Sequence, residues 1–189
     1  MKTVVVTGGI GSGKSAVCRL LAKRGIPVYD SDARTKALYS ELPDLVPSLE
    51  KALAMPLRTP EGRLDKARLS ARIFSDDSAR ETLESIVYPL VKEDFLAWRN
   101  RQQDVPFVVL ESAVILSKPL FADVIDAVVL VQAPQEVRVR RVMERDGLSR
   151  EEVLGRLAAQ PPIQASLVIE NSGSLSALDN AVDQTLALL

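Results

Sequence analysis

Histidine is absent from this chain of 189 residues, and cysteine occurs once. Without histidine there is no histidine general base, no histidine metal ligand and no Ser-His-Asp triad. Acid–base chemistry must therefore fall to carboxylates, lysines or tyrosines. The single cysteine, Cys18, excludes an intrachain disulfide. Its apolar position in a helical pattern favours a buried structural thiol over a redox or catalytic one.

Long apolar runs and an excess of either charge are also missing. No stretch of about 18 apolar residues predicts a membrane span, and the apolar run at the N-terminus is too short for a signal peptide. The net charge is −1, which provides no electrostatic footprint for non-specific binding of DNA or RNA. These absences predict a cytoplasmic protein without a membrane or nucleic-acid partner.

The chain does contain a complete G-x-x-x-x-G-K-S sequence over residues 8–15, between an expected strand and an expected helix. This pattern predicts a P-loop that holds the phosphates of ATP or GTP. Its glycines allow the backbone N–H groups to form an anion nest at the positive end of the helix. Lys14 supplies charge to the β- and γ-phosphates, and the Ser15 hydroxyl ligates Mg²⁺. The nucleotide-binding residues expected here are Gly9, Ile10, Gly11, Ser12, Gly13, Lys14, Ser15 and Ala16.

Apolar runs that alternate with helical patterns predict an α/β fold, with a parallel sheet covered on both faces. The expected strands are 2–7, 26–29, 107–110, 127–131 and 167–169, and the expected helices around them are 15–24, 32–38, 136–145 and 174–189. Residues 42–101 are mostly helical, with breaks expected at Pro43, Pro47, Pro56, Pro60 and Pro89. We therefore expect one P-loop kinase domain over 1–189, with a core at about 1–40 and 102–189, a helical substrate-binding insertion at about 41–101 and a lid at about 147–165.

Acidic residues follow two of the expected strands, where ligands of parallel sheets bind. Asp30 and Asp32 come after the second strand and can activate or orient an acceptor hydroxyl. The alternative is that they form a turn and cap the next helix, a role that Asp32 suits. Glu111 ends the third strand in the Walker B arrangement, which holds Mg²⁺ directly or through water. The alternative for Glu111 is a solvated charge at a strand end.

Four arginines, Arg138, Arg140, Arg141 and Arg145, lie in one predicted helix. Arg141 and Arg145 are four residues apart and share a helix face, which can clamp transferring phosphates. The alternative is a solvated basic face beside Glu144 and Asp146. Residues 150–160 would then form a lid that closes over ATP and excludes water.

No N-K-x-D motif for guanine recognition is present, and large ATPases need a longer chain. A kinase for a small molecule is therefore favoured over a GTPase or a motor ATPase. Two other possibilities stay open: a related kinase for a nucleotide or another small alcohol, and a catalytically weak protein that binds ATP.

Several blocks, in the same order along nearly the whole chain, resemble the dephospho-CoA kinase family. They are residues 7–15 (TGGIGSGKS), 28–32 (VYDSD), 62–66 (GRLDK), 83–89 (LESIVYP), 141–146 (RVMERD) and 169–173 (IENSG). The resemblance implies transfer of a phosphoryl group from ATP, with Mg²⁺, to the ribose 3′-hydroxyl of dephospho-CoA, as the last step of CoA synthesis. The oligomeric state expected is a monomer or a small homo-oligomer.

Roles for individual residues are also implied by the resemblance. Asp32 is the base candidate, Lys14, Ser15 and Arg141 serve the phosphates, and Asn171 belongs to the nucleotide site. The substrate side comprises Asp30, Asp32, Lys36, Tyr88 and Glu111. The chain departs from the family pattern at Tyr88 (histidine in the family), at Ser117 (often glutamate) and at Arg138 (often glutamine), and residues 160–171 form a shorter segment than usual.

Overall fold

The computed structural model describes residues 1–158 and 162–189. It divides the chain into two compact units, Met1–Asp30 with Gln102–Leu189, and Ser31–Arg101. The second unit begins at Ser31, whereas the sequence suggested an insertion that starts near residue 41. The division into core, insertion and lid stays a prediction.

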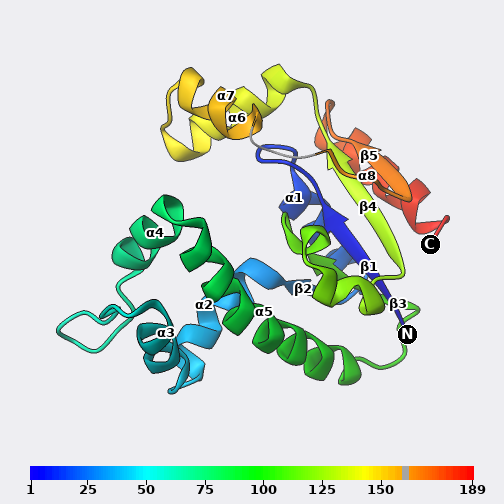
Figure 1. Cartoon of the computed structure of the whole chain (residues 1–189). Coiled ribbons are helices and arrows are strands. Elements are labelled where there is room, and N and C mark those ends of the chain that lie inside the picture. Colours follow the sequence, from blue (N-terminus) through cyan, green and yellow to red (C-terminus); the bar gives the residue numbers. More distant parts are fainter. Residues whose placement is uncertain (159–161) are drawn as a thin grey trace. The chain divides into compact units, whose positions relative to one another are not determined.

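The first unit contains a sheet of five parallel strands in the order β2-β3-β1-β4-β5 (Figure 1). The strands are β1 (Lys2–Thr7), β2 (Val28–Asp30), β3 (Phe107–Glu111), β4 (Ala127–Gln132) and β5 (Leu167–Glu170). The predicted α/β fold with a parallel sheet is thus confirmed. The central strand β1 is buried along Thr3–Thr7, as expected for a β-branched run in a parallel sheet.

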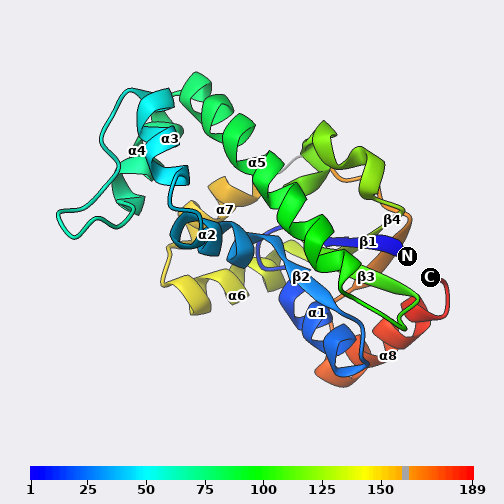
Figure 2. The same cartoon turned by 90° about the horizontal axis from the view of Figure 1, so that it is seen from below.

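Two helices, α1 (Lys14–Lys23) and α8 (Leu175–Leu186), pack against each other and cover one face of the sheet (Figure 2). Two further helices, α6 (Gln135–Asp146) and α7 (Arg150–Ala158), pack against each other after β4. Short 3₁₀ turns follow β3, at Ile115–Ser117 and Pro119–Val124. The expected helix 136–145 is present, and α7 lies within the segment that the sequence suggested as a lid. Residues 159–161 of that lid lie outside the described residues.

Alternation along β1 decides which side chains meet α1. Val4 and Val6 lie in one apolar cluster with Val17 and Cys18 of α1, because side chains at positions i and i+2 of a strand share a face. Burial raises the pKa of the Cys18 thiol, and the negative charge of Glu111 adds to the shift. Cys18 is thus held as a neutral thiol, as expected of a structural cysteine.

The second unit is built from α2 (Ser31–Glu41), α3 (Leu45–Leu53), α4 (Lys66–Ser75) and α5 (Asp77–Asn100). The other three helices all pack on α5. The side chain of Asp76 accepts hydrogen bonds from the backbone N–H groups of Ser78 and Ala79 and so caps α5.

Three local expectations for this region were wrong. Pro89 does not break the chain's helical course, since α5 continues through it for 24 residues. Pro47 is the third residue of α3. In the first turn of a helix the backbone N–H groups have no partner within the helix, so a proline there removes no hydrogen bond. Asp32 is not the cap of α2, because the helix already begins at Ser31 and Asp32 lies in its first turn. The loop expected around 55–64 is present, with Pro56 and Pro60 outside any helix.

No helix in the described part of the chain is long and apolar enough to span a membrane.

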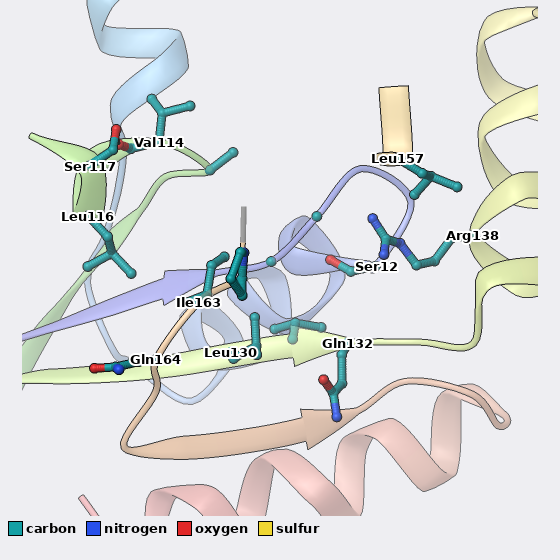
Figure 3. Close-up of a pocket in the computed structure, with 15 residues that line it drawn as sticks. Ser12, Val114, Leu116, Ser117, Leu130, Gln132, Arg138, Leu157, Ile163 and Gln164 are labelled. Atoms are coloured by element: carbon teal, nitrogen blue, oxygen red, sulfur yellow. The ribbon is translucent and has the colours of Figure 1, made fainter. Parts of the chain in front are cut away.

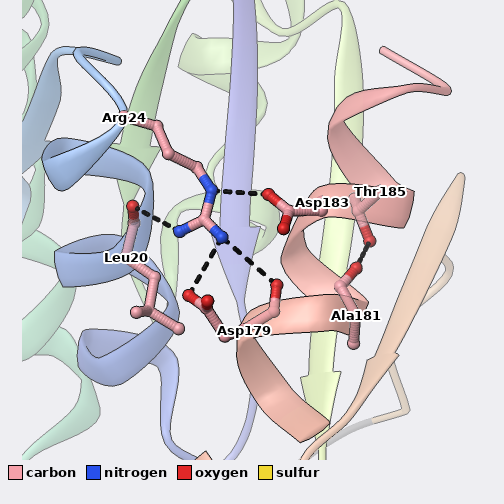
Figure 4. Close-up of polar contacts among 6 residues, drawn as sticks. All are labelled: Leu20, Arg24, Asp179, Ala181, Asp183 and Thr185. Carbon is pink, nitrogen blue, oxygen red and sulfur yellow. Dashed lines mark hydrogen bonds and ion pairs between the residues drawn. The ribbon is translucent and has the colours of Figure 1, made fainter. Parts of the chain in front are cut away.

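Arg24 links the C-terminal end of α1 to α8 (Figure 4). Its Nε donates to Asp183 Oδ1 at 2.7 Å, and its Nη2 donates to Asp179 Oδ1 at 2.9 Å. Nη1 donates to the Leu20 carbonyl at 3.1 Å. The guanidinium lowers the pKa of Asp183, so this carboxylate stabilises the fold above its ordinary pKa, and the contribution is lost as the pH falls through the lowered value.

We expect Arg24→Ala to lower the thermal midpoint at neutral pH by about 2–4 °C, the scale for losing one modest interaction in a chain of this size. The difference from the wild type should narrow as the pH falls below the ordinary pKa of an aspartate, about 4, and through the lowered pKa of Asp183. Thermal unfolding followed by circular dichroism measures both effects. Lys23→Ala is the control, since it removes one exposed charge from the same helix. Equal midpoints for the two variants would contradict this role for Arg24.

Candidate functional site

The carboxyl ends of the parallel strands gather polar residues at one edge of the sheet. Residues 8–13 follow the central strand β1 and lead directly into α1. Asp30, the last residue of β2, is paired in register with Glu111, the last residue of β3. The strand order therefore brings the glycine-rich loop and these two carboxylates to the same edge, as their positions in the sequence predicted.

The loop adopts a conformation that depends on glycine. Gly11 has a φ of 76° and Gly13 a φ of 97°, and residues with a Cβ atom rarely adopt such positive values. A Cβ on Gly13 would also lie 2.0 Å from the Asn171 side-chain nitrogen, which is closer than van der Waals contact allows. Gly13 is thus required both by its backbone angle and by the approach of Asn171.

A pocket of about 590 Å³ opens at this loop, and four cationic side chains line it: Lys14, Arg19, Arg141 and Arg145. Among the described residues, only Arg145 of these four forms an ion pair with a carboxylate, that of Asp146 at 2.6 Å. This pairing lowers the pKa of Asp146. Three cations without a partner carboxylate, together with a helix N-terminus, make the pocket suitable for a polyphosphate.

Arg19 was not predicted from the sequence, although a signal for it was available. It lies four residues after Ser15 on α1, so both residues share one helix face. Arg145 was predicted only as the less favoured partner of Arg141 on their shared face, and both line the pocket. Arg140 lies instead beside a smaller hollow with Glu136 and Arg150.

Ser15 and Glu111 form the oxygen-rich part of the site. The Ser15 hydroxyl donates to Glu111 Oε1 at 2.7 Å, although the two residues are 96 positions apart. A hydroxyl and a carboxylate are hard oxygen ligands of the kind that Mg²⁺ uses with substrate phosphates and water. The described residues contain no cluster of three or more metal-ligating side chains. This donor set fits a Mg²⁺ ion that is shared with a bound nucleotide better than a metal site made of protein ligands alone.

Arg141 and Asn171 both contact the backbone of the loop. Arg141 Nη1 donates long hydrogen bonds of 3.4 Å to the carbonyls of Gly11 and Ser12. Asn171, which follows β5 directly, is buried. Both predicted residues are therefore at the loop, where they contact its backbone and each other.

A second cavity, of about 770 Å³, adjoins the same loop (Figure 3). Its wall is mostly apolar, with Val114, Leu116, Leu130, Leu157 and Ile163 among the residues that line it. Gly9 and Ala113 line both this cavity and the cationic pocket. The cationic pocket thus adjoins a space suited to an organic group.

Two positions that depart from the family pattern lie at this second cavity. Ser117 and Arg138 both line it, and Arg138 Nε donates to the Ile10 carbonyl at 2.9 Å. Burial lowers the pKa of the Arg138 guanidinium.

Two hydroxyl groups are buried at the loop. Among the described residues, the side-chain oxygens of Thr7 and Ser12 have no hydrogen-bond partner.

Three predicted residues, Asp32, Lys36 and Tyr88, belong to the second unit. Asp32 and Lys36 are both exposed and lie one turn apart on α2. Burial raises the pKa of Tyr88 to about 12, with further contributions from the charges of Glu84 and Asp32. Tyr88 is therefore a neutral phenol at physiological pH, and it lies close enough to Asp32 for that charge to affect its pKa.

Contacts between α2 and α5 fix the helix that carries Asp32. The Arg34 guanidinium donates to both carboxylate oxygens of Asp94 on α5, at 2.9 and 3.0 Å. It also binds Glu41 at the other end of α2. This bidentate contact restrains the orientation of α2 on α5.

A family model described as dephospho-CoA kinase matches residues 2–177. The chain belongs to the dephospho-CoA kinase family. Members of this family use ATP and catalyse the final step of CoA biosynthesis. Among its curated members, the dephospho-CoA kinase of Anaeromyxobacter dehalogenans is 36% identical, over 99% of this chain and 92% of that protein. The dephospho-CoA kinase of Thermus thermophilus is 39% identical, over 97% of this chain and 90% of that protein.

Solved structures agree with this assignment. A crystal structure of a Thermus thermophilus protein superposes with a TM-score of 0.83 at 38% identity, and the match covers 100% of this chain and 97% of that one. The dephospho-CoA kinase of Campylobacter jejuni gives a TM-score of 0.70 at 22% identity, over 99% and 96% of the two chains. A shikimate kinase from Acinetobacter baumannii gives 0.54 at 15% identity, over 100% and 92%. The last two similarities show the fold alone, that of P-loop kinases.

We expect Gly13→Ala to weaken ATP binding at least about tenfold, because the positive φ alone costs about 1–2 kcal/mol and the added methyl collides with Asn171. Isothermal titration with ATP measures the change. Gly25→Ala is the matched control, since Gly25 also has a positive φ but follows the far end of α1, and a Cβ there meets no atom within 4 Å. A Gly13→Ala protein that binds ATP as the wild type does would contradict the geometry derived for the loop.

Proposed function

We propose that this chain transfers the γ-phosphoryl group of ATP to the ribose 3′-hydroxyl of dephospho-CoA, giving CoA and ADP. The observation that carries the proposal is the cationic pocket at the glycine-rich loop, whose positive charge suits a polyphosphate. The cationic pocket does not identify the acceptor, because pockets of this kind occur in many kinases. The acceptor is therefore proposed from the names of the relatives.

Lys14 and Arg141 would bind the phosphates of ATP, and the residues that line the phosphate side are Gly9, Ile10, Gly11, Gly13, Ser15 and Ala16. Their positive charge would offset the negative charge that develops on the transferring group. Ser15 and Glu111 would hold Mg²⁺, and the bound ion would neutralise part of the negative charge of the phosphates. Arg19 and Arg145 extend the same positive lining toward the solvent side of α1 and α6.

Asp32 would accept the proton of the acceptor hydroxyl, with Asp30 as the alternative base at the end of β2. Asp30, Lys36, Tyr88 and Glu111 would complete the substrate side. Tyr88 replaces the histidine of the family pattern with a phenol whose pKa is raised to about 12. It can donate or accept a hydrogen bond but cannot take over the titration that a histidine provides near neutral pH.

The setting of the reaction is also proposed. We place the enzyme in the cytoplasm, as a monomer or small homo-oligomer that acts on small molecules and has no nucleic-acid partner. The near balance of charge, −1 overall, supports the last point.

Incubation with Mg-ATP and dephospho-CoA should give ADP release that depends on the acceptor, with a product heavier by one phosphate by mass spectrometry. Addition of EDTA should stop the reaction. Shikimate, gluconate and nucleoside monophosphates serve as control acceptors. Turnover of a control acceptor instead of dephospho-CoA would indicate a related kinase, and ATP binding without turnover of any acceptor would indicate a catalytically weak protein.

Asp32→Asn should lower kcat by about 10²–10⁴-fold, the usual contribution of a general base, with little change in the affinity for ATP. Asp44→Asn is the control, because it makes the same change at an exposed position between α2 and α3. Steady-state kinetics with both variants and with Asp30→Asn separate the two base candidates. Full activity of Asp32→Asn would show that this residue is not the base.

A further inference from the structure

An anion nest requires the backbone N–H groups of the loop to point inward, and this turns several carbonyl groups outward. Outward carbonyls need partners, because an unpaired polar group away from water costs free energy. At this loop the partners are side chains from elsewhere in the chain. The carbonyls concerned belong to three successive residues, Ile10, Gly11 and Ser12.

Asn171 makes the most buried of these contacts. Its side-chain Nδ2 donates to the Ser12 carbonyl at 2.8 Å, across 159 positions of sequence. Asn171 is 6% exposed, so water does not readily replace the bond. Its Oδ1 accepts a long hydrogen bond of 3.4 Å from Arg141 Nη2. The amide thus joins the loop, the end of β5 and one of the cations of the phosphate pocket.

Only an amide suits this position. The group that faces a carbonyl must donate, and the group that faces a guanidinium must accept. A carboxylate would satisfy Arg141 but would set one oxygen against the Ser12 carbonyl oxygen. An apolar side chain would leave the Ser12 carbonyl with only the long hydrogen bond from Arg141. Gly13 has no side chain at the point where the amide approaches, which leaves room for this contact.

Arg138 holds the loop from another side. Its Nε donates to the Ile10 carbonyl at 2.9 Å, from the first turns of α6. The loop is therefore restrained at both ends of the turn that contains Gly11, by side chains from two different elements.

We propose that Asn171 is a positioning residue for the nucleotide: its amide holds the Ser12 carbonyl outward and so keeps the loop's N–H groups arranged for the phosphates before ATP binds. The role rests on the proposed function only in that ATP is the ligand. It differs from direct contact with the nucleotide, which the family resemblance implied for Asn171. Arg138 acts in the same way, through Ile10.

The test uses tripolyphosphate as the probe, because it fills a polyphosphate site without a base, a ribose or turnover. Calorimetric titration of Asn171→Asp with tripolyphosphate and with ATP should give dissociation constants raised about tenfold or more, and by a similar factor for both ligands. Asn180→Asp is the matched control, since it makes the same chemical change at an exposed position of α8. It should bind both ligands like the wild type.

Kinetics separate positioning from a general loss of structure. Asn171→Asp should raise KM for ATP and leave KM for dephospho-CoA within about twofold, while circular dichroism and the thermal midpoint of the free protein stay close to those of Asn180→Asp. Asn171→Ala removes the amide without placing a charge beside Arg141, and it should raise both dissociation constants in the same direction by a smaller factor. It also replaces Asn171→Asp if that variant does not fold. Arg138→Ala should weaken tripolyphosphate binding in the same direction.

Wild-type affinity for tripolyphosphate in a folded Asn171 variant overturns the proposal. A variant that binds tripolyphosphate normally but loses affinity for ATP also overturns it, since that result places Asn171 at the base or ribose. The test is independent of the acceptor. If tripolyphosphate binding depends on Asn171 but the wild-type protein does not phosphorylate dephospho-CoA, the proposed function is disproved and this inference still stands.

Discussion

The strand β1 lies between β3 and β4, and its parallel pairing with both decides where the groups of the site can lie. Because all five strands run in the same direction, every strand delivers its last residue to one edge of the sheet. The glycine-rich loop leaves the central strand there, beside the carboxylate of Glu111 from one neighbour and Gln132 from the other. A different register would separate Ser15 from Glu111, whose side chains are 2.7 Å apart.

Charge at this edge is distributed unevenly, and the distribution follows from the elements that supply it. The cations come from α1 and α6, while the acidic side chains come from the ends of β2 and β3. Positive groups thus surround the loop, and oxygen ligands lie where a metal ion can share them with phosphate. This separation of donor types is what a phosphoryl-transfer site needs, since the phosphates and the acceptor hydroxyl require opposite environments.

Much of the fold could be predicted because its signals are local. The strands are short apolar runs bounded by polar residues, and four of the five begin and end within one residue of their expected bounds. Pro89 shows where local rules fail. An isolated helix would break there, but α5 is packed against three other helices, and this packing offsets the loss of one backbone hydrogen bond. The mistaken cap at Asp32 has a smaller cause: the helix begins two residues earlier than a cap at Asp32 requires, and sequence patterns locate helix ends with the least precision.

By itself, the sequence determined the glycine-rich loop, the fold class and the family, because the loop, the strands and the family's motif blocks each consist of residues that are adjacent in the chain. Only the tertiary structure decided which residues that are far apart in the chain meet at the loop. It placed Arg19 and Arg145 in the pocket, and it set Asn171 against the backbone of a loop 159 positions away. The reason is physical: a helix or turn is specified by residues a few positions apart, whereas a contact between loops depends on strand order and register, which no short pattern contains.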